Sequence, residues 1–220
     1  MGALAIILTL RVQIRMSRDD STLGVNEIRV DWLDDLKACL IELKKATLDT
    51  NTPNLYLGLL GEFAFSRWLE ARGISFDHRT RSNPSELLTD FVVEDLTPSQ
   101  NTVKIDVKTS GIRPAQVSRI LSIDQFESIP THSEILVWTF YSSWRNSITI
   151  DSWTPVSMLN ECRVKSVSAP PDFALTNDPA VELDFTETIF VYEFPSFMMF
   201  DIGDLEMRLK GYGGGVQSLT

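Results

Sequence analysis

The chain has 220 residues, of which 43% are hydrophobic, so it can form one domain with a sizeable core. Its formal net charge of −10 argues against indiscriminate binding to nucleic acids, because contacts with phosphate drive non-specific affinity. The two cysteines, Cys39 and Cys162, are far apart and lack the spacing of a zinc site. We therefore expect both thiols to be reduced core groups in a cytoplasmic protein.

The acidic excess lies toward the C-terminus. Residues 120–220 hold 5 basic and 14 acidic side chains, whereas residues 62–119 hold 8 of each kind. Three acids of the middle segment, Glu62, Asp90 and Asp106, are the candidate site residues considered below. Without them basic side chains outnumber acidic ones in this segment, so the surroundings of that site are neutral to basic. This distribution fits a local neutral-to-basic cleft on an otherwise acidic body, and it argues against a protein that coats DNA broadly.

The apolar N-terminus, Met1 to Leu10, is too short to cross a membrane and lacks the preceding positive charge of a signal peptide. We expect residues 1–25 to be an N-terminal extension, which is either an extra strand or sequence upstream of a translation start at Met16. A single domain should occupy residues 26–210, with a first helix capped by Asp31. A flexible tail is expected at residues 211–220.

Periodicity then predicts the remaining elements. A second helix is expected from about residue 52 to 72, stopping at Gly73. Strands are expected near residues 74–77, 90–94, 103–109, 135–141, 147–150 and 188–192, with the two around residue 145 forming a hairpin. One short helix should begin at Pro155, and another should cover residues 201–210. Residues 166–187 carry three prolines and no basic residue, which indicates a surface excursion. The order predicts an α/β fold with a mixed β-sheet core flanked by helices.

The strand around Asp106 alternates strictly between apolar and polar side chains. Val103, Ile105 and Val107 should lie on one face, and Lys104, Asp106 and Lys108 on the other. If Asp90 lies on the paired strand, two carboxylates meet, and at about 4 Å they repel by roughly 4 kcal/mol at an effective dielectric near 20. A hard divalent cation removes that cost. We therefore expect Mg²⁺ at this place, with Mn²⁺ as a substitute, and Lys108 is suited to orient a water or neutralise charge on phosphate.

Glu62 is the only charged residue in residues 55–65. Because its helix is apolar on nearly every side, the helix should be buried, and a lone carboxylate there needs a cation, a metal or donors. One interpretation is that Glu62 faces the same site as Asp106. The alternative is a buried ion pair with Arg67 or Arg72.

The order Glu62, Asp90 and then Asp106-Val107-Lys108 resembles that of the PD-(D/E)XK nuclease superfamily, over roughly residues 55–110 and more loosely to about 160. The resemblance implies a restriction-endonuclease-like fold with four catalytic residues. Glu62 would be the helix acid, Asp90 the first strand acid, and Asp106 and Lys108 the triplet. The metal would be held by Asp90, Asp106, the backbone carbonyl of Val107, and Glu62. Thr89 stands at the family's Pro position, and the triplet acid is Asp rather than the commoner Glu.

Basic and polar residues flank this site in the sequence and could hold phosphates or reach base edges. They are His78, Arg79, Arg81, Arg113, Gln116 and Arg119. The alternative for each is an ordinary solvated loop position.

Together these features predict a metal-dependent nuclease that hydrolyses phosphodiester bonds, as a DNA endonuclease. By analogy with the family it would act as a homodimer, and no membrane partner is expected. The alternative is a nuclease-fold protein that binds nucleic acid or a protein partner without cleaving. A third interpretation is an acidic interaction or assembly protein.

Overall fold

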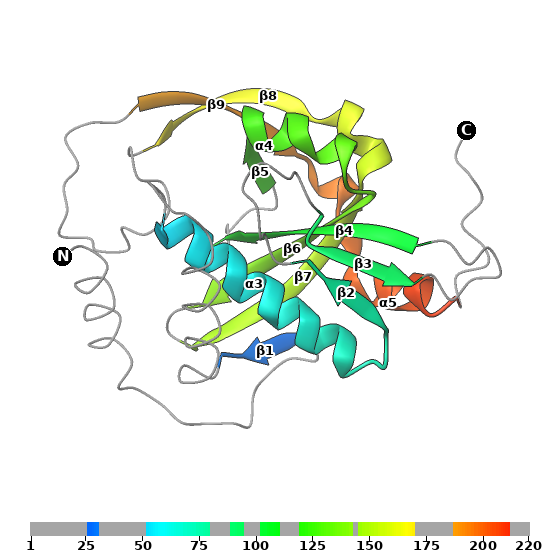
Figure 1. Ribbon diagram of the computed structural model, residues 1–220. Helices are drawn as coiled ribbons and strands as arrows, with labels where there is room; N and C mark the ends of the chain where they lie inside the picture. Colours follow the sequence, from blue (N-terminus) through cyan, green and yellow to red (C-terminus); the bar gives the residue numbers. More distant parts are fainter. Residues whose placement is uncertain are drawn as a thin grey trace.

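A mixed β-sheet runs through the centre of the protein (Figure 1). The computed structural model describes residues 26–30, 52–79, 89–94, 102–110, 119–142, 145–169 and 187–211. Within them the sheet has seven strands in the order β1-β7-β6-β4-β3-β2, with β10 beside β7. These are β1 (Glu27–Arg29), β2 (Phe76–His78), β3 (Phe91–Glu94), β4 (Thr102–Ser110), β6 (Ile135–Ser142), β7 (Ser147–Pro155) and β10 (Phe200–Asp201). Strands β4 and β6 are parallel, and the other neighbours are antiparallel.

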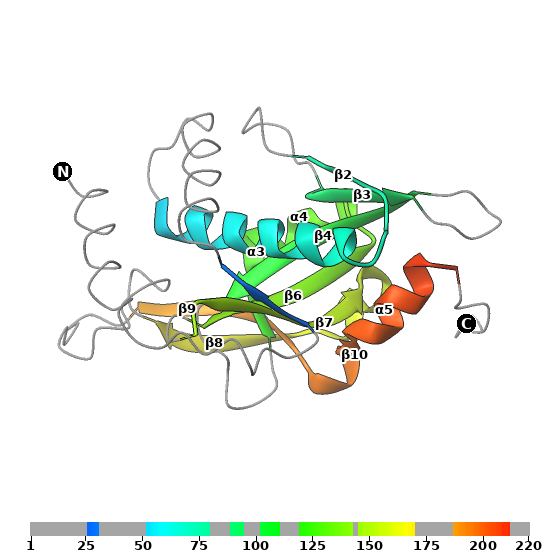
Figure 2. The same cartoon turned by 90° about the horizontal axis from the view of Figure 1, so that it is seen from below.

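The helix α3 (Thr52–Glu70) lies across one face of this sheet (Figure 2). Gly73 follows it with a φ of +67°, the left-handed conformation that ends helices and that glycine adopts without strain. The shorter helix α5 (Ile202–Leu209) begins at Asp201, whose carboxylate accepts a hydrogen bond from the N–H of Gly203 at 2.7 Å. One buried cluster joins α3, β4 and α5: Phe65, Trp68, Leu69, Val103, Ile105, Val107, Ile202, Leu205 and Leu209.

A second, three-stranded antiparallel sheet packs against the other face. Its order is β5 (Arg119–Ser122), β9 (Glu187–Phe194), β8 (Arg163–Ala169). The helix α4 (Ile123–Ser128) follows β5, and three short 3-10 helices are η2 (Ile129–Thr131), η3 (Val156–Glu161) and η4 (Ser196–Met198). Leu136 and Trp138 of β6 pack here against Leu121, Ile129 and Phe194. The central sheet is therefore covered on both faces (Figure 2).

The predicted fold class, a mixed α/β sheet flanked by helices, is confirmed. The alternation predicted for β4 is also confirmed, because Val103, Ile105 and Val107 belong to the α3 face. The strand expected at residues 74–77 lies at Phe76–His78 instead, since the N–H of Ile74 still donates to the carbonyl of Leu69 in α3. Strand β8 continues through Ala169, so the first four residues of the expected excursion are strand.

Several expectations fall outside the described residues: the N-terminal extension, the helix from Asp31, residues 170–186, and the tail beyond Gly211. In the part of the chain that is described, no helix is both long and apolar enough to span a membrane.

Candidate functional site

The position of Glu62 is set by how closely α3 approaches the sheet. The preceding residue, Gly61, faces Thr109 of β4 and Thr139 of β6, whose hydroxyl groups are 3.0 Å apart. A Cβ at Gly61 would lie 1.8 Å from the Thr109 hydroxyl and 2.8 Å from the Thr139 hydroxyl. Only glycine therefore allows the helix backbone to lie this close, and Glu62 is the next residue of that helix.

Asp90 and Asp106 are brought together by strand register. Phe91 is the Cα partner of Ile105, so Asp90, one residue earlier, lies opposite Asp106. Both residues are buried, with 5% and 3% of their surface exposed. The backbone N–H of Val107 donates to the Asp90 carboxylate at 2.7 Å, which ties this acid to the triplet.

Thr89, at the Pro position of the family pattern, secures the start of β3. Its buried hydroxyl donates to the carbonyl of Ile105 at 2.8 Å, and the hydroxyl of Ser133 lies 3.4 Å from it. A proline has no side-chain donor for this bond. Thr89 therefore joins β3 to β4 immediately before Asp90 through a bond that a proline could not make.

The two acids share a hydrogen bond and have opposite pKa shifts. Burial, followed by the charges of Glu62 and Asp106, raises the pKa of Asp90 well above its usual value. Burial alone would also raise the pKa of Asp106, but the charge of Lys108 and the hydrogen bond with Asp90 outweigh it and lower that pKa. The Asp90 carboxyl group therefore ionises less readily than that of Asp106.

Lys108 lies on the same side as Asp106. Its Nζ is 2.8 Å from Oδ2 of Asp106, and Nε2 of His132 lies 4.0 Å from that same oxygen. The contact with Lys108 is an ion pair, and the buried Oδ2 has no further hydrogen-bond partner within the described residues. A buried carboxylate oxygen with remaining acceptor capacity is what a cation ligand requires.

Glu62 contacts a histidine rather than an arginine. Its Oε2 lies 3.0 Å from Nε2 of His78, and 15% of each side chain is exposed. The alternative ion pair is not formed with Arg72, which binds Glu206 at 2.8 Å, or with Arg67, which donates to the carbonyl of Arg29. The charge of Glu62 acts on Asp90, so the two acids belong to one electrostatic cluster.

The cluster is assembled from both faces of the sheet. Glu62 and His78 lie on the α3 face, where Phe91, the register partner of His78, is buried. Asp106 and Lys108 lie on the opposite face, since their register partners Leu136 and Trp138 pack toward the second sheet. Asp90 directly precedes β3, and its pKa is affected by Glu62 from one face and by Asp106 and Lys108 from the other.

Both histidines of the chain lie at this cluster, and the sequence pattern assigned neither of them to the carboxylates. His78 was expected in a basic loop but is the last residue of β2. His132 follows η2, where its Nδ1 lies 3.2 Å from the hydroxyl of Thr131.

The candidate nucleic-acid contacts differ in their surroundings. Arg79 is exposed beside the site, and its backbone N–H donates to the carbonyl of Asp90 at 2.9 Å. Arg119 is instead held between the two sheets, where its guanidinium pairs with Asp151 at 2.6 Å and lies 4.0 Å above the ring of Phe140. That environment favours a structural role for Arg119. Arg81, Arg113 and Gln116 lie outside the described residues.

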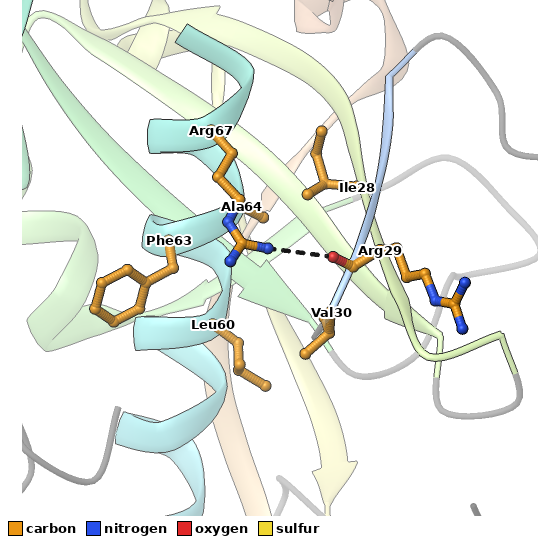
Figure 3. Close-up of a pocket in the computed structure, with 7 residues that line it drawn as sticks. All are labelled: Ile28, Arg29, Val30, Leu60, Phe63, Ala64 and Arg67. Atoms are coloured by element: carbon orange, nitrogen blue, oxygen red, sulfur yellow. Dashed lines mark hydrogen bonds between the residues drawn. The ribbon is translucent and has the colours of Figure 1, made fainter. Parts of the chain in front are cut away.

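A small pocket between β1 and α3 is separate from the carboxylates (Figure 3). Figure 3 shows the Arg67 side chain reaching across it to the carbonyl of Arg29. The lining is mainly apolar: Ile28, Arg29, Val30, Leu60, Phe63, Ala64 and Arg67. Its walls include none of the candidate site residues.

Within the described residues, no group of three or more His, Cys, Asp or Glu side chains is arranged to hold a metal ion by itself. Two carboxylates and a backbone carbonyl nevertheless fit Mg²⁺, which usually keeps several waters and takes only one or two carboxylates from the protein. Comparisons of the chain with family models, with curated proteins and with solved structures found no match. The chemistry of the site therefore has to be argued from its own residues.

Proposed function

We propose that this chain is a Mg²⁺-dependent nuclease with a restriction-endonuclease-like fold, which hydrolyses phosphodiester bonds in DNA as an endonuclease. The observation that carries the proposal is the pair of buried carboxyl groups of Asp90 and Asp106, with the Lys108 ammonium 2.8 Å from one of them. Burying like charges together is costly, so such a pair is retained where it binds a cation or does chemistry.

The groups that would hold the cation are the carboxylates of Asp90 and Asp106 and the backbone carbonyl of Val107. The carboxylate of Glu62, whose charge acts on Asp90, would be the fourth. The buried Oδ2 of Asp106, which has no hydrogen-bond partner among the described residues, supports this assignment. When bound, Mg²⁺ supplies positive charge near phosphorus and a more acidic water, and Mn²⁺ could replace it.

Lys108 has the complementary role in this proposal. It is the cation next to the triplet acid, and its partly exposed side chain can meet both a phosphate oxygen and an attacking water. A fixed positive charge acts more strongly there than in bulk water, because the neighbouring carboxylates lie in a buried environment.

The alternative is a nuclease-fold protein that binds a nucleic acid or a protein without cleaving. Two observations favour it: Lys108 already neutralises Asp106, and the net charge of −10 weakens binding to phosphate. In that case the ion pair would be structural and a divalent cation would have no effect.

The test is incubation of the purified chain with supercoiled plasmid, linear, branched and single-stranded DNA, in Mg²⁺, in Mn²⁺ and in EDTA. Cleavage that requires the divalent cation supports the proposal. The non-cleaving alternative takes its place if DNA is bound but remains intact in every cation. The plasmid separates an endonuclease from an exonuclease, because a closed circle has no ends.

A further inference from the structure

His78 is held rigidly beside Glu62. Its ring is stacked on that of Phe91, with centroids 4.5 Å apart and an interplanar angle of 7°. The ring of Phe63 meets it edge-on at 5.7 Å and 89°. With the ring fixed in this way, Nε2 points at Oε2 of Glu62 at 3.0 Å.

The backbone around His78 is tied to the candidate site as well. His78 is the register partner of Phe91, which directly follows Asp90, and the next N–H, that of Arg79, donates to the carbonyl of Asp90. The ring that contacts Glu62 and the strand entrance that carries Asp90 therefore belong to one rigid unit.

Glu62 needs such a partner. The long side chain of a glutamate loses much of its rotamer freedom when it is fixed. The negative charge in the Asp90–Asp106 pair also repels it. Among the described residues, the group that holds its carboxylate by a hydrogen bond is His78.

We propose that His78 is a positioning residue, which holds Glu62 in the orientation needed to complete the divalent-cation site at Asp90 and Asp106. This inference rests on the proposed function. It gives His78 a role through Glu62, in place of the direct contact with nucleic acid expected from the sequence. Groups that orient a metal ligand from outside typically contribute about 10–100-fold to metal affinity.

A double-mutant cycle separates this role from a merely structural one. His78→Phe keeps an aromatic ring for the stack on Phe91 but loses the hydrogen bond, whereas His78→Gln keeps a donor and loses the ring. Each change is made in the parent and in Glu62→Gln. Two quantities are measured for every variant: the Mg²⁺ concentration for half-maximal cleavage, and the Mg²⁺-induced shift of Tm, which requires no activity.

We expect His78→Phe to raise the half-saturating Mg²⁺ concentration about 10-fold, and to have no further effect in Glu62→Gln. His78→Gln should recover part of the loss. A matched control is Glu70→Gln, which removes an exposed carboxylate from the same helix and should leave both quantities unchanged.

The outcomes are distinguishable. If the parent shows neither Mg²⁺-dependent cleavage nor a Mg²⁺-induced Tm shift, the proposed function fails and this inference fails with it. If Glu62→Gln weakens the Mg²⁺ response but His78→Phe does not, only the positioning role is overturned. An equal effect of His78→Phe in the parent and in Glu62→Gln also overturns it, because His78 would then act independently of Glu62.

Discussion

The carboxylate of Asp90 accepts a hydrogen bond from the backbone N–H of Val107, the central residue of the Asp106-Val107-Lys108 triplet, at 2.7 Å. Two residues 17 positions apart in the sequence are thereby joined by a single bond inside the sheet. A change in how β3 pairs with β4 would therefore alter the distance between the two acids.

Lys108→Ala should reduce cleavage by about 100-fold or more, the scale of losing a preorganised charge in an active site. Its position on the polar face of β4 suggested little cost in stability, but Lys108 pairs with a carboxylate that is 4% exposed. The Tm should therefore fall in EDTA and recover in part with Mg²⁺, which replaces the lost cation. The control is Lys104→Ala, an exposed lysine on the same face of β4. A Lys108→Ala variant that cleaves at the parent rate would make the triplet a structural strand.

Asp90→Asn should stabilise the protein in EDTA while removing its response to Mg²⁺. An asparagine oxygen can still accept from Val107, its amide can donate to Asp106, and it carries no charge to be buried beside that acid. Because burial raises the pKa of Asp90, its contribution to stability is complete below the ordinary pKa of about 3.8 and is lost as pH rises through the folded-state pKa. The advantage of Asn should hence grow with pH. Thermal unfolding at several pH values measures it, and a parent-like Mg²⁺ shift in Asp90→Asn would contradict the assignment.

Gly61→Ala should destabilise the protein by about 1–3 kcal/mol, because the new methyl group would overlap the Thr109 hydroxyl. Gly58→Ala is the matched control on the same helix. A Cβ there meets nothing within 4 Å, so the higher helix propensity of alanine should stabilise the protein by up to about 1 kcal/mol. Urea unfolding of the pair separates the close contact from propensity. Equal effects of the two substitutions would show that the approach of α3 is not tight.

Arg119 and Asp151 should behave as a partly buried ion pair that joins the two sheets. Removing one partner, as in Asp151→Ala, should cost about 1–3 kcal/mol, whereas an apolar replacement of both, Arg119→Met with Asp151→Leu, should cost less than either single change. Denaturant unfolding gives these values. If Arg119→Met lowers the affinity for DNA and leaves the stability unchanged, Arg119 contacts nucleic acid directly, as the sequence predicted.

The sequence sufficed for the elements whose pattern is local. The apolar run of α3 predicts a buried helix and the alternation of β4 predicts a strand, so Glu62, Asp106 and Lys108 could be placed on the correct elements. The approach of Asp90 to Asp106 followed once β3 paired with β4. Strands β1 and β10 are three and two residues long and exist through their pairing with β7, so no periodicity announces them.

Contacts that depend on register or on an irregularity were beyond reach. His78 reaches Glu62 because β2 pairs with β3 at one particular offset. Asp151 reaches Arg119 because the β6–β7 register shifts between Trp138 and Thr139, leaving Asp151 as the extra residue of a bulge, a device that re-aims a side chain. One signal was present and unused: Ser122 with Gln125 is a capping box that marks the start of α4.

Because the central sheet is covered on both faces, the exposure of the side chains at the candidate site decides which of them an incoming phosphate would meet first. α3 and α5 close one approach and the second sheet closes the other. Of the ion pair near the entrance of β3, the Lys108 side chain is 19% exposed and that of Asp106 only 4%. An anion arriving from solvent at this pair would therefore encounter the Lys108 ammonium before the Asp106 carboxylate, so attraction precedes repulsion along its path.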